Sequence, residues 1–373
     1  MVRNLLAAAA LAAAAHVSAE TGVTESQIVL GQAAVFSGPA ADLGTQMREG
    51  ALAYFDYVNS QGGVNGRKIV LKSIDDGYEP DRAAAATKKL IEEEKVFALF
   101  GYVGTPTFNA AAPIIKEARV PLVAAFTGAE SLRDPMIRYV FNVRASYFDE
   151  TEQIVQHLTA MGVDKIAVFY QNDAYGKAGL EGVNRALKKR NMAVAGTATV
   201  ERNSVDVAKA VADMSKLDPQ AIVMISAYKS CAAFIKAEKA AGKSPSFWNV
   251  SFVGSKALAK ELGAEGRGVQ ISQVVPFPWD ESIPVVREYS RLLKNSKSEP
   301  NFSSLEGFIS AKVIVEGIRR AGRNLTRDTL IKGLESMDPY DVGGFKVTYS
   351  PQEHRGSRYV DLTIISRDQK FVR

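Results

Sequence analysis

The sequence predicts an α/β protein in which helices cover both faces of parallel, doubly wound sheets. Three observations support this. Apolar runs alternate with amphipathic helical segments along the chain, the stretch 28–77 reads as a βαβ unit, and a length of 373 residues suggests two domains. The alternation alone would fit one large doubly wound sheet nearly as well as two lobes.

The βαβ unit at 28–77 is the clearest local pattern. An apolar run at 28–35 suits a buried parallel strand, and a Ser-Gly-Pro turn follows it. Gly62 and Gly63 supply the left-handed residues that end a helix, and a second strand begins at Ile69. A right-handed crossover makes the two strands parallel. The helix between them has one apolar stripe, formed by Met47, Ala51, Phe55 and Val58.

The remaining elements follow in the same alternation, which the hydrophobic period predicts segment by segment. The predicted strands are 96–101, 121–125, 139–143, 165–170, 193–200, 221–225, 247–250, 269–271, 345–349 and 359–365. The predicted helices are 81–94, 107–118, 148–161, 177–190, 205–217, 231–241, 283–294, 303–321 and 327–336.

The N-terminus predicts export to the periplasm. Arg3 gives a positive start, 5–15 is an apolar run too short to span a bilayer, and Val17-Ser18-Ala19 resembles a signal-peptidase site. We expect residues 1–19 to be a signal peptide that is cleaved after Ala19. Because Cys231 is the only cysteine, no intrachain disulfide can form, although the periplasm would permit one.

Composition argues against several functional classes. The formal charge of +5 comes from Lys and Arg that are interleaved with acids, which is typical of a solvated surface and not of a nucleic-acid-binding patch. The three histidines, His16, His157 and His354, have no metal-ligand spacing, and the chain contains no G-x-S-x-G, P-loop or G-x-G-x-x-G motif. We therefore expect a protein that is not an enzyme and carries no cofactor or metal.

Three motifs resemble one known family. "SGP" after the first strand, "GGVNGRK" after the first helix and "DDGYEP" after the second strand are similar to the leucine/isoleucine/valine-binding proteins, the type I periplasmic solute-binding proteins of ABC importers. The similarity continues to about Ser366. It implies two Rossmann-like lobes joined by a three-strand hinge. The crossings are expected near 143–146, 274–277 and 345–349, with lobe 1 at 20–143 plus 277–345 and lobe 2 at 146–274 plus 349–373.

The resemblance also implies a solute site between the lobes. In this family, Ser or Thr side chains and backbone groups at two strand ends hold the ligand carboxylate, and Thr105, Ala125 and Thr127 match those positions, with Tyr102 beginning the first of these strand ends. Thr105 followed by Pro106 also fits a helix N-cap, and Thr127 with Glu130 fits a capping box. Plain helix capping is therefore the alternative role for both threonines.

Further cleft residues come from the other matched positions. Tyr175 and Tyr228 match tyrosines that line the family cleft from the second lobe, and Phe36 and Ser37 are expected at its floor. Phe252 aligns where the amino-acid binders carry the glutamate that pairs with the ligand ammonium.

The neutral Phe252 leaves two interpretations of how the site treats an ammonium group on the solute. Leu43 likewise replaces an aromatic side chain of the family. Because a buried ammonium without a partner is costly, either Asp149 or Asp173 serves as its partner, or the solute has no α-ammonium.

The resulting hypothesis is a monomeric periplasmic substrate-binding protein of a branched-chain amino acid-type ABC importer. Its solute would be a small carboxylate or amino acid, its partners the permease subunits, and its mechanism hinge closure. The alternative is a ligand-sensing periplasmic domain that partners a membrane signalling protein, since one fold can serve both roles.

Overall fold

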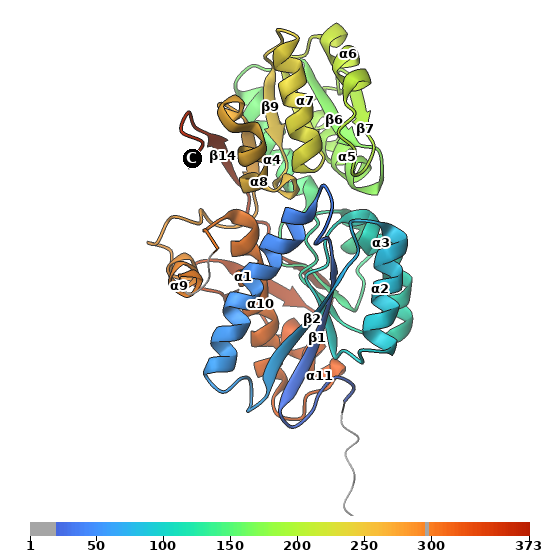
Figure 1. Ribbon diagram of the computed structural model, residues 1–373, viewed down its shortest axis with the longest axis vertical. Helices are drawn as coiled ribbons and strands as arrows, with labels where there is room; N and C mark the ends of the chain where they lie inside the picture. The colour runs from blue at the N-terminus through green and yellow to red at the C-terminus, as the bar shows by residue number, and fades with distance from the viewer. Residues whose placement is uncertain (1–19, 295–297) are drawn as a thin grey trace, which may run out of the picture.

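The computed structural model describes residues 20–294 and 298–373 and shows two α/β lobes, drawn one above the other in Figure 1. The predicted signal peptide, residues 1–19, lies outside the described residues. Each lobe is built around its own main sheet, and a small third sheet accompanies the first lobe.

The first lobe contains a five-stranded sheet in the order β2-β1-β3-β4-β5, in which every pair of neighbours is parallel. The predicted pairing of the first two strands is confirmed, since Gln27 lies opposite Lys68 and Ala34 opposite Asp75. The strands are β1 (Gln27–Ala34), β2 (Lys68–Asp75), β3 (Ala98–Phe100), β4 (Leu122–Val123) and β5 (Val140–Phe141).

Helices cover both faces of this sheet, with α1 and α10 on one side and α2 and α3 on the other (Figure 1). Gly50 and Gly307 let α1 and α10 pack backbone against backbone: a Cβ at Gly50 would lie 1.7 Å from the Ser304 carbonyl oxygen. The first lobe's helices are α1 (Ala41–Ser60), α2 (Pro80–Glu92), α3 (Thr105–Ala118), α9 (Pro284–Leu293), α10 (Phe302–Ala321) and α11 (Arg327–Glu335).

The second lobe contains a seven-stranded sheet in the order β15-β14-β10-β9-β8-β6-β7. Its strands pair in parallel from β10 to β7, whereas β14 and β15 are antiparallel additions at one edge. The strands are β6 (Ile166–Gln171), β7 (Thr197–Val200), β8 (Ala221–Ile225), β9 (Ser246–Asn249), β10 (Gln270–Gln273), β14 (Asp361–Ile365) and β15 (Phe371–Val372). The helices are α4 (Tyr147–Ala160), α5 (Ala174–Lys188), α6 (Ala208–Leu217), α7 (Tyr228–Ala240) and α8 (Ser255–Leu262).

The third predicted crossing, at 345–349, is wrong. β12 (Lys346–Ser350) pairs with β11 (Tyr340–Asp341) and β13 (Glu353–Gly356), and this small sheet stays with the first lobe. The Tyr349 hydroxyl donates to the Asn142 carbonyl oxygen (2.7 Å), which holds the strand beside β5. The chain therefore reaches the second sheet only at β14, so the crossing lies between Gly356 and Asp361, and the second lobe does not resume at 349.

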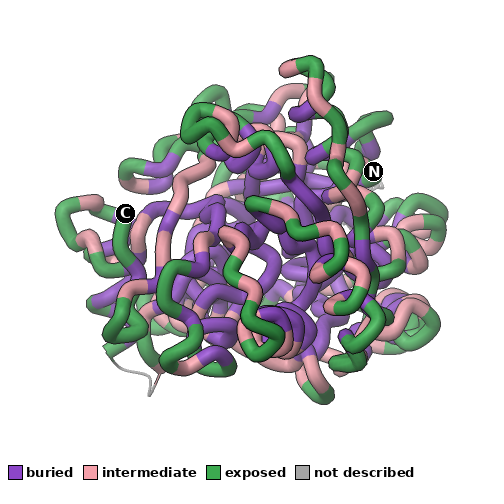
Figure 2. Tube along the Cα trace, turned by 90° about the horizontal axis from the view of Figure 1, so that it is seen from above, coloured by how far each residue is buried: buried purple, intermediate pink, exposed green. Residues whose placement is uncertain are grey.

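Buried residues fill the interior, as the purple trace in Figure 2 shows, and the buried hydrophobic residues of the two lobes form one continuous cluster. The segment 121–128, which leads from β4 toward the second lobe, is buried throughout. Within residues 20–294 and 298–373, no helix is long and apolar enough to span a membrane.

Candidate functional site

Four aromatic rings meet between the lobes. Tyr78 and Phe126 come from the first lobe, and Tyr175 and Phe252 from the second. The Phe252 ring centroid lies 4.5 Å from that of Tyr175, 5.6 Å from that of Phe126 and 6.0 Å from that of Tyr78. All four side chains are buried. Phe252 is therefore the centre of an apolar contact that both lobes build.

A row of hydroxyl groups lies beside these rings. The oxygens of Thr105 and Thr127 are 2.7 Å apart, and the Thr127 oxygen is 3.2 Å from the Tyr147 hydroxyl. The Tyr175 hydroxyl is buried and has no hydrogen-bond partner among the described residues. A group rich in acceptor oxygens, such as a carboxylate, would satisfy these donors.

Neither threonine is the helix cap that its sequence context predicts. Thr105 is the first residue of α3, and Gly104 is the N-cap. The turn that begins at Glu130 has no side-chain cap, and the Glu130 carboxylate instead pairs with Arg355 (3.5 Å). The two threonine hydroxyls instead contact each other, and the Thr127 oxygen also accepts from the Ala129 N–H (3.4 Å).

Backbone geometry explains how Tyr78 reaches the site. Tyr78 has a φ of 63° and Gly104 a φ of 99°, both in the region where a side chain is disfavoured. A Cβ on Gly104 would lie 2.2 Å from the Tyr78 ring. Glycine at this position therefore leaves the space that the tyrosine ring fills, and the ring faces the second lobe.

A buried charge network lies behind the rings. Arg144, in the first crossing, lies 3.4 Å from Glu150 of α4 and 3.6 Å from Glu306 of α10, and its guanidinium lies 4.8 Å from the centroid of the Phe126 ring. Glu150 also accepts from the Ser251 N–H (2.8 Å). Burial raises the pKa of Glu306 to about 7. The positive charge of Arg144 is thus already balanced, so the hydroxyl row is the more available anchor for an anion.

The other predicted site residues are distributed as follows. Ala125 is buried next to Phe126, and the Tyr228 hydroxyl accepts from the Asp42 N–H across the lobes (3.4 Å). The Tyr102 hydroxyl is directed away from the ring cluster, since it bonds Thr87 on α2 (3.0 Å). Tyr102 thus contributes its backbone carbonyl, which accepts from the Phe126 N–H.

Phe36 and Ser37 lie at the end of β1 and outside the ring cluster. The Ser37 side chain is exposed and donates to Asp75, and the Phe36 ring lies beneath the Arg48 guanidinium, 4.0 Å from its carbon. The structure therefore does not bring them together with the threonines.

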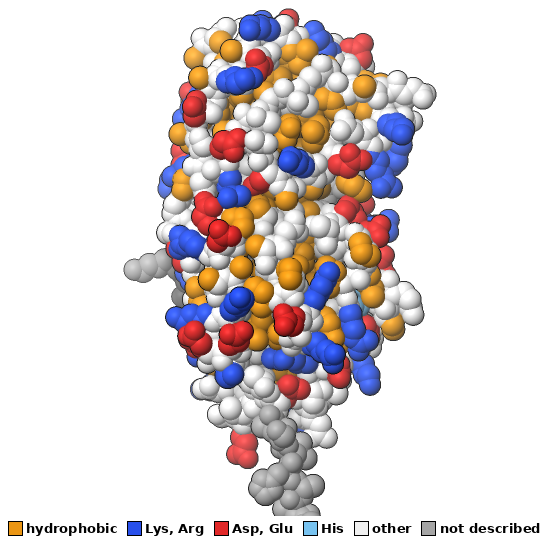
Figure 3. Space-filling model, turned by 90° about the vertical axis from the view of Figure 1, so that its right-hand side faces the viewer, with side chains coloured by type: hydrophobic (Ala, Val, Ile, Leu, Met, Phe, Trp, Pro, Cys, Tyr) orange, Lys and Arg blue, Asp and Glu red, His pale blue; other side chains and the backbone are white. Residues whose placement is uncertain are grey.

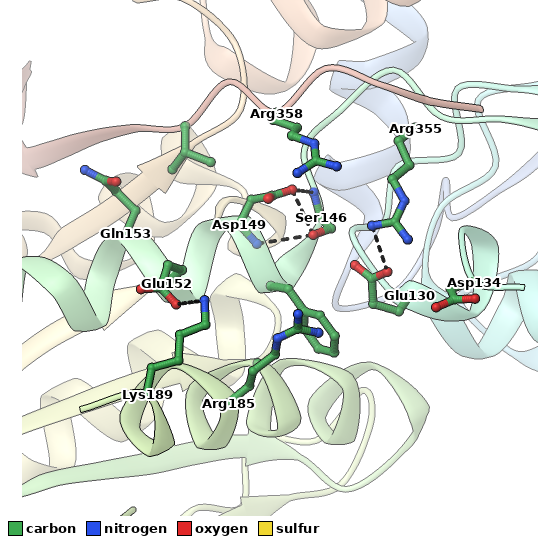
Figure 4. Close-up of a pocket in the computed structure, with 13 residues that line it drawn as sticks. Glu130, Asp134, Ser146, Asp149, Glu152, Gln153, Arg185, Lys189, Arg355 and Arg358 are labelled. Atoms are coloured by element: carbon green, nitrogen blue, oxygen red, sulfur yellow. Dashed lines mark hydrogen bonds and ion pairs between the residues drawn. The ribbon is translucent and has the colours of Figure 1, made fainter. Parts of the chain in front are cut away.

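Both acids that could have replaced the family glutamate have other partners. Asp149 caps α4, where its carboxylate accepts from the Ser146 N–H (3.0 Å), and it lines a separate polar pocket of about 580 Å³ beside the crossings (Figure 4). Asp173 caps α5 by accepting from the Tyr175 N–H (2.9 Å) and pairs with Arg202 (3.4 Å). Neither carboxylate is left free to pair with an ammonium group.

Sequence reasoning missed several residues of this site. Tyr78, Phe126 and Tyr147 belong to it, and the Gln171 amide donates to the Tyr78 hydroxyl across the lobes (3.3 Å). Tyr78 lies inside the "DDGYEP" motif, and Phe126 stands between Ala125 and Thr127. Their place in those motifs was the available signal. It was easy to overlook, because aromatic residues next to a strand end are ordinarily part of the core.

Asp76 offers a test of this geometry through pH. Burial raises the pKa of Asp76 to about 7, above about 3.9 for an unfolded chain, and one carboxylate oxygen has no partner among the described residues. The folded state therefore favours the protonated acid, so its contribution to stability is present at low pH and is lost as the pH rises from about 4 to about 7. We expect Asp76→Asn to lose less unfolding free energy than the wild type between pH 5 and pH 8 in urea titrations. Equal losses would contradict the burial of this carboxyl group.

Metal and thiol chemistry find no support in the described ranges. Within residues 20–294 and 298–373, no group of three His, Cys, Asp or Glu side chains is arranged to hold a metal ion. Burial raises the pKa of the Cys231 thiol, which makes it less reactive.

The face that carries α2, α3 and β7 shows acids and bases interspersed over both lobes (Figure 3).

Two α/β lobes that present hydroxyl and aromatic side chains to each other define a two-lobed ligand-binding protein. Residues 27–370 match the family model described as "Periplasmic binding protein". The chain belongs to this family, in its leucine/isoleucine/valine-binding branch. This is a family of periplasmic binding proteins and not of enzymes.

Known relatives cover nearly the whole chain. "Leu/Ile/Val-binding protein homolog 7" of Brucella suis biovar 1 (strain 1330) is 26% identical, over 96% of this chain and 93% of its own. The crystal structure of a "possible leucine/isoleucine/valine-binding protein" from Rhodopirellula baltica SH 1 is 33% identical, with a TM-score of 0.89 over 94% of this chain and 97% of that one. A "fatty acid ABC transporter substrate-binding protein" from Thermomonospora curvata shares the fold at 22% identity, with a TM-score of 0.86 over 95% and 92% of the two chains.

Proposed function

We propose that this protein is the periplasmic substrate-binding protein of an ABC importer and that it binds a small carboxylate between its lobes. The observation that carries this proposal is the buried row of hydroxyls formed by Thr105, Thr127 and Tyr147, beside the unpartnered hydroxyl of Tyr175. The names of the relatives support the role of a solute-binding protein, and the signal peptide expected to be cleaved after Ala19 would deliver the chain to the periplasm.

The solute's body should be aliphatic or aromatic and should not need an α-ammonium. Phe252 occupies the centre of the ring cluster, so a neutral side chain stands where the resemblance places an acid. Leu43 lies close to Gly254 at the same junction, since a Cβ on Gly254 would lie 2.6 Å from its side chain. These apolar surfaces favour contact with a hydrocarbon body.

Binding would proceed by hinge closure. The rings of Tyr78 and Phe126 belong to one lobe and those of Tyr175 and Phe252 to the other, so a solute that touches both sets stabilises the arrangement in which the lobes are close. A permease that recognises this arrangement would then receive only the loaded protein.

Tryptophan fluorescence tests closure, and the structure identifies the useful reporter. Trp279 is 44% exposed and lies next to Phe371 of the second lobe, with ring centroids 5.8 Å apart, whereas Trp248 is fully buried in β9. A saturating solute should change the emission of the wild type and of Trp248→Phe, and should leave that of Trp279→Phe nearly unchanged. If calorimetry proves binding and the wild-type emission stays constant, the hinge-closure proposal is contradicted.

A further inference from the structure

A polar contact joins the two lobes on the side of α2 and β7. Arg202 and Asn203 lie in the turn after β7 in the second lobe, and Glu79 is the N-cap of α2 in the first. The Arg202 guanidinium and the Asn203 amide each donate to the Glu79 carboxylate at 2.8 Å, and the Asn203 amide also lies 3.2 Å from the Gly77 carbonyl oxygen. We call this set of contacts the interlobe latch.

The latch is adjacent to two of the rings in the site. Glu79 directly follows Tyr78 in the chain. Arg202 also pairs with Asp173 (3.4 Å), which caps the helix that carries Tyr175 near its start. One guanidinium therefore links the segment that presents Tyr78 to the segment that presents Tyr175.

The surroundings of Arg202 allow its ion pair with Glu79 to stabilise the closed arrangement of the lobes. The Arg202 side chain is 23% exposed and the Glu79 side chain 42% exposed, so solvent screens this ion pair in part, from the Glu79 side. Burial alone would lower the pKa of Arg202, but the bond to Glu79 and the charge of Asp173 raise it above its ordinary value. Because Glu79 lies on the first lobe and Arg202 and Asn203 lie on the second, the bonds to Glu79 must break when the lobes separate, whereas the pair with Asp173 stays within the second lobe.

We propose that Arg202 and Asn203 are positioning residues that set the affinity for the solute without touching it, by holding the lobes closed through Glu79. This proposal has two consequences. The first, a larger closed fraction of the protein, holds with no solute present. The second, tighter binding of the solute, rests on the proposed function. Affinity follows because a solute that binds the closed form has an apparent dissociation constant that rises as the closed fraction falls.

A second ion pair in the molecule provides a matched control. Arg190 pairs with Glu152 at 2.8 Å and is 22% exposed, nearly the same as Arg202, but Glu152 in α4 and Arg190 in the turn after α5 both belong to the second lobe. Arg190→Ala therefore removes an ion pair of the same type and length, from an arginine of nearly the same exposure, without changing any contact between the lobes.

The first measurement is small-angle X-ray scattering of the full chain without solute. Arg202→Ala should increase the radius of gyration by more than the experimental error, and Arg190→Ala should leave it at the wild-type value. Glu79→Gln should act like Arg202→Ala, which keeps the test available if one variant folds poorly. Arg202→Lys should give a radius of gyration between those of Arg202→Ala and the wild type, since lysine keeps the charge but cannot bond both acids with one planar group. Equal radii for Arg202→Ala, Glu79→Gln and the wild type would overturn the proposal.

The second measurement is calorimetry with 4-methylpentanoate and 3-phenylpropanoate as probes. For whichever acid binds the wild type, Arg202→Ala should raise the dissociation constant about 3- to 10-fold, and Arg190→Ala should leave it unchanged. An unchanged constant in Arg202→Ala overturns the role in affinity. If neither acid binds the wild type, the proposed carboxylate function fails, and the scattering result decides the latch by itself.

Discussion

Thr105→Val and Thr127→Val are each expected to weaken solute binding by about one to two decades. A hydroxyl that bonds a charged ligand group contributes roughly 1.5–3 kcal/mol, and valine keeps the shape of threonine while removing that bond. In the folded protein, Thr105→Val removes one hydroxyl contact and Thr127→Val removes two, so we expect a loss of on the order of 1 kcal/mol in unfolding free energy, larger for Thr127→Val. Calorimetry gives the first quantity and urea unfolding gives the second.

Thr107→Val is the control for both variants. Thr107 is also buried and lies in the same first turn of α3, but its hydroxyl donates to the Gly104 carbonyl oxygen (3.0 Å) and takes no part in the hydroxyl row. It should lose stability and keep its affinity. Unchanged affinity in Thr105→Val and Thr127→Val, with lowered melting temperatures, would give both threonines a purely structural role.

Acids that lack an ammonium group should bind more than two decades tighter than the matching amino acids. The ammonium would be buried beside neutral Phe252, while Asp149 and Asp173 are engaged as helix caps, and an unpaired buried charge costs several kcal/mol. Suitable pairs are 4-methylpentanoate with leucine and 3-phenylpropanoate with phenylalanine. A solute at about 100 times its dissociation constant stabilises by ~2.7 kcal/mol, which raises the melting temperature by several degrees.

The methyl ester of each acid is the control for this comparison. It keeps the hydrocarbon body but removes the negative charge, so it should produce little thermal shift if the hydroxyl row binds a carboxylate. Large shifts with the amino acids and none with the deaminated acids would contradict the proposal and would require an ammonium partner. Equal shifts with acid and ester would show that the hydrocarbon body alone is recognised.

Much of the fold could be predicted because its signals are local. The β1-α1-β2 unit follows from an apolar run, one apolar helix stripe and a Gly-Gly break, and the structure has all three where the sequence indicates. The crossing into β14 could not be predicted this way. The alternating pattern of β12 fits any half-buried strand, and long-range contacts assign it to the first lobe, among them the bond from Tyr349 to Asn142 and the packing of Tyr349 on Phe141.

The site shows the same division between local and long-range information. Thr105 and Thr127 could be singled out as polar residues at strand ends, but a local reading also makes them helix caps. Their hydroxyls meet because Gly104 takes over the N-cap of α3 and no side chain caps the turn at Glu130. Tyr147 and Arg202 come from distant segments, and no local spacing places them at the cleft.

The most direct test of the central claim is mass spectrometry of the small molecules that the purified protein releases on denaturation. We expect one predominant carboxylic acid with an apolar body, released unchanged at about one molecule per chain, and strongly depleted in a Thr105→Val/Thr127→Val double variant that still folds. A released compound that lacks a carboxylate, or the same acid released in equal amount by the double variant, would contradict the claim that these two threonines hold the carboxylate of a solute between the lobes.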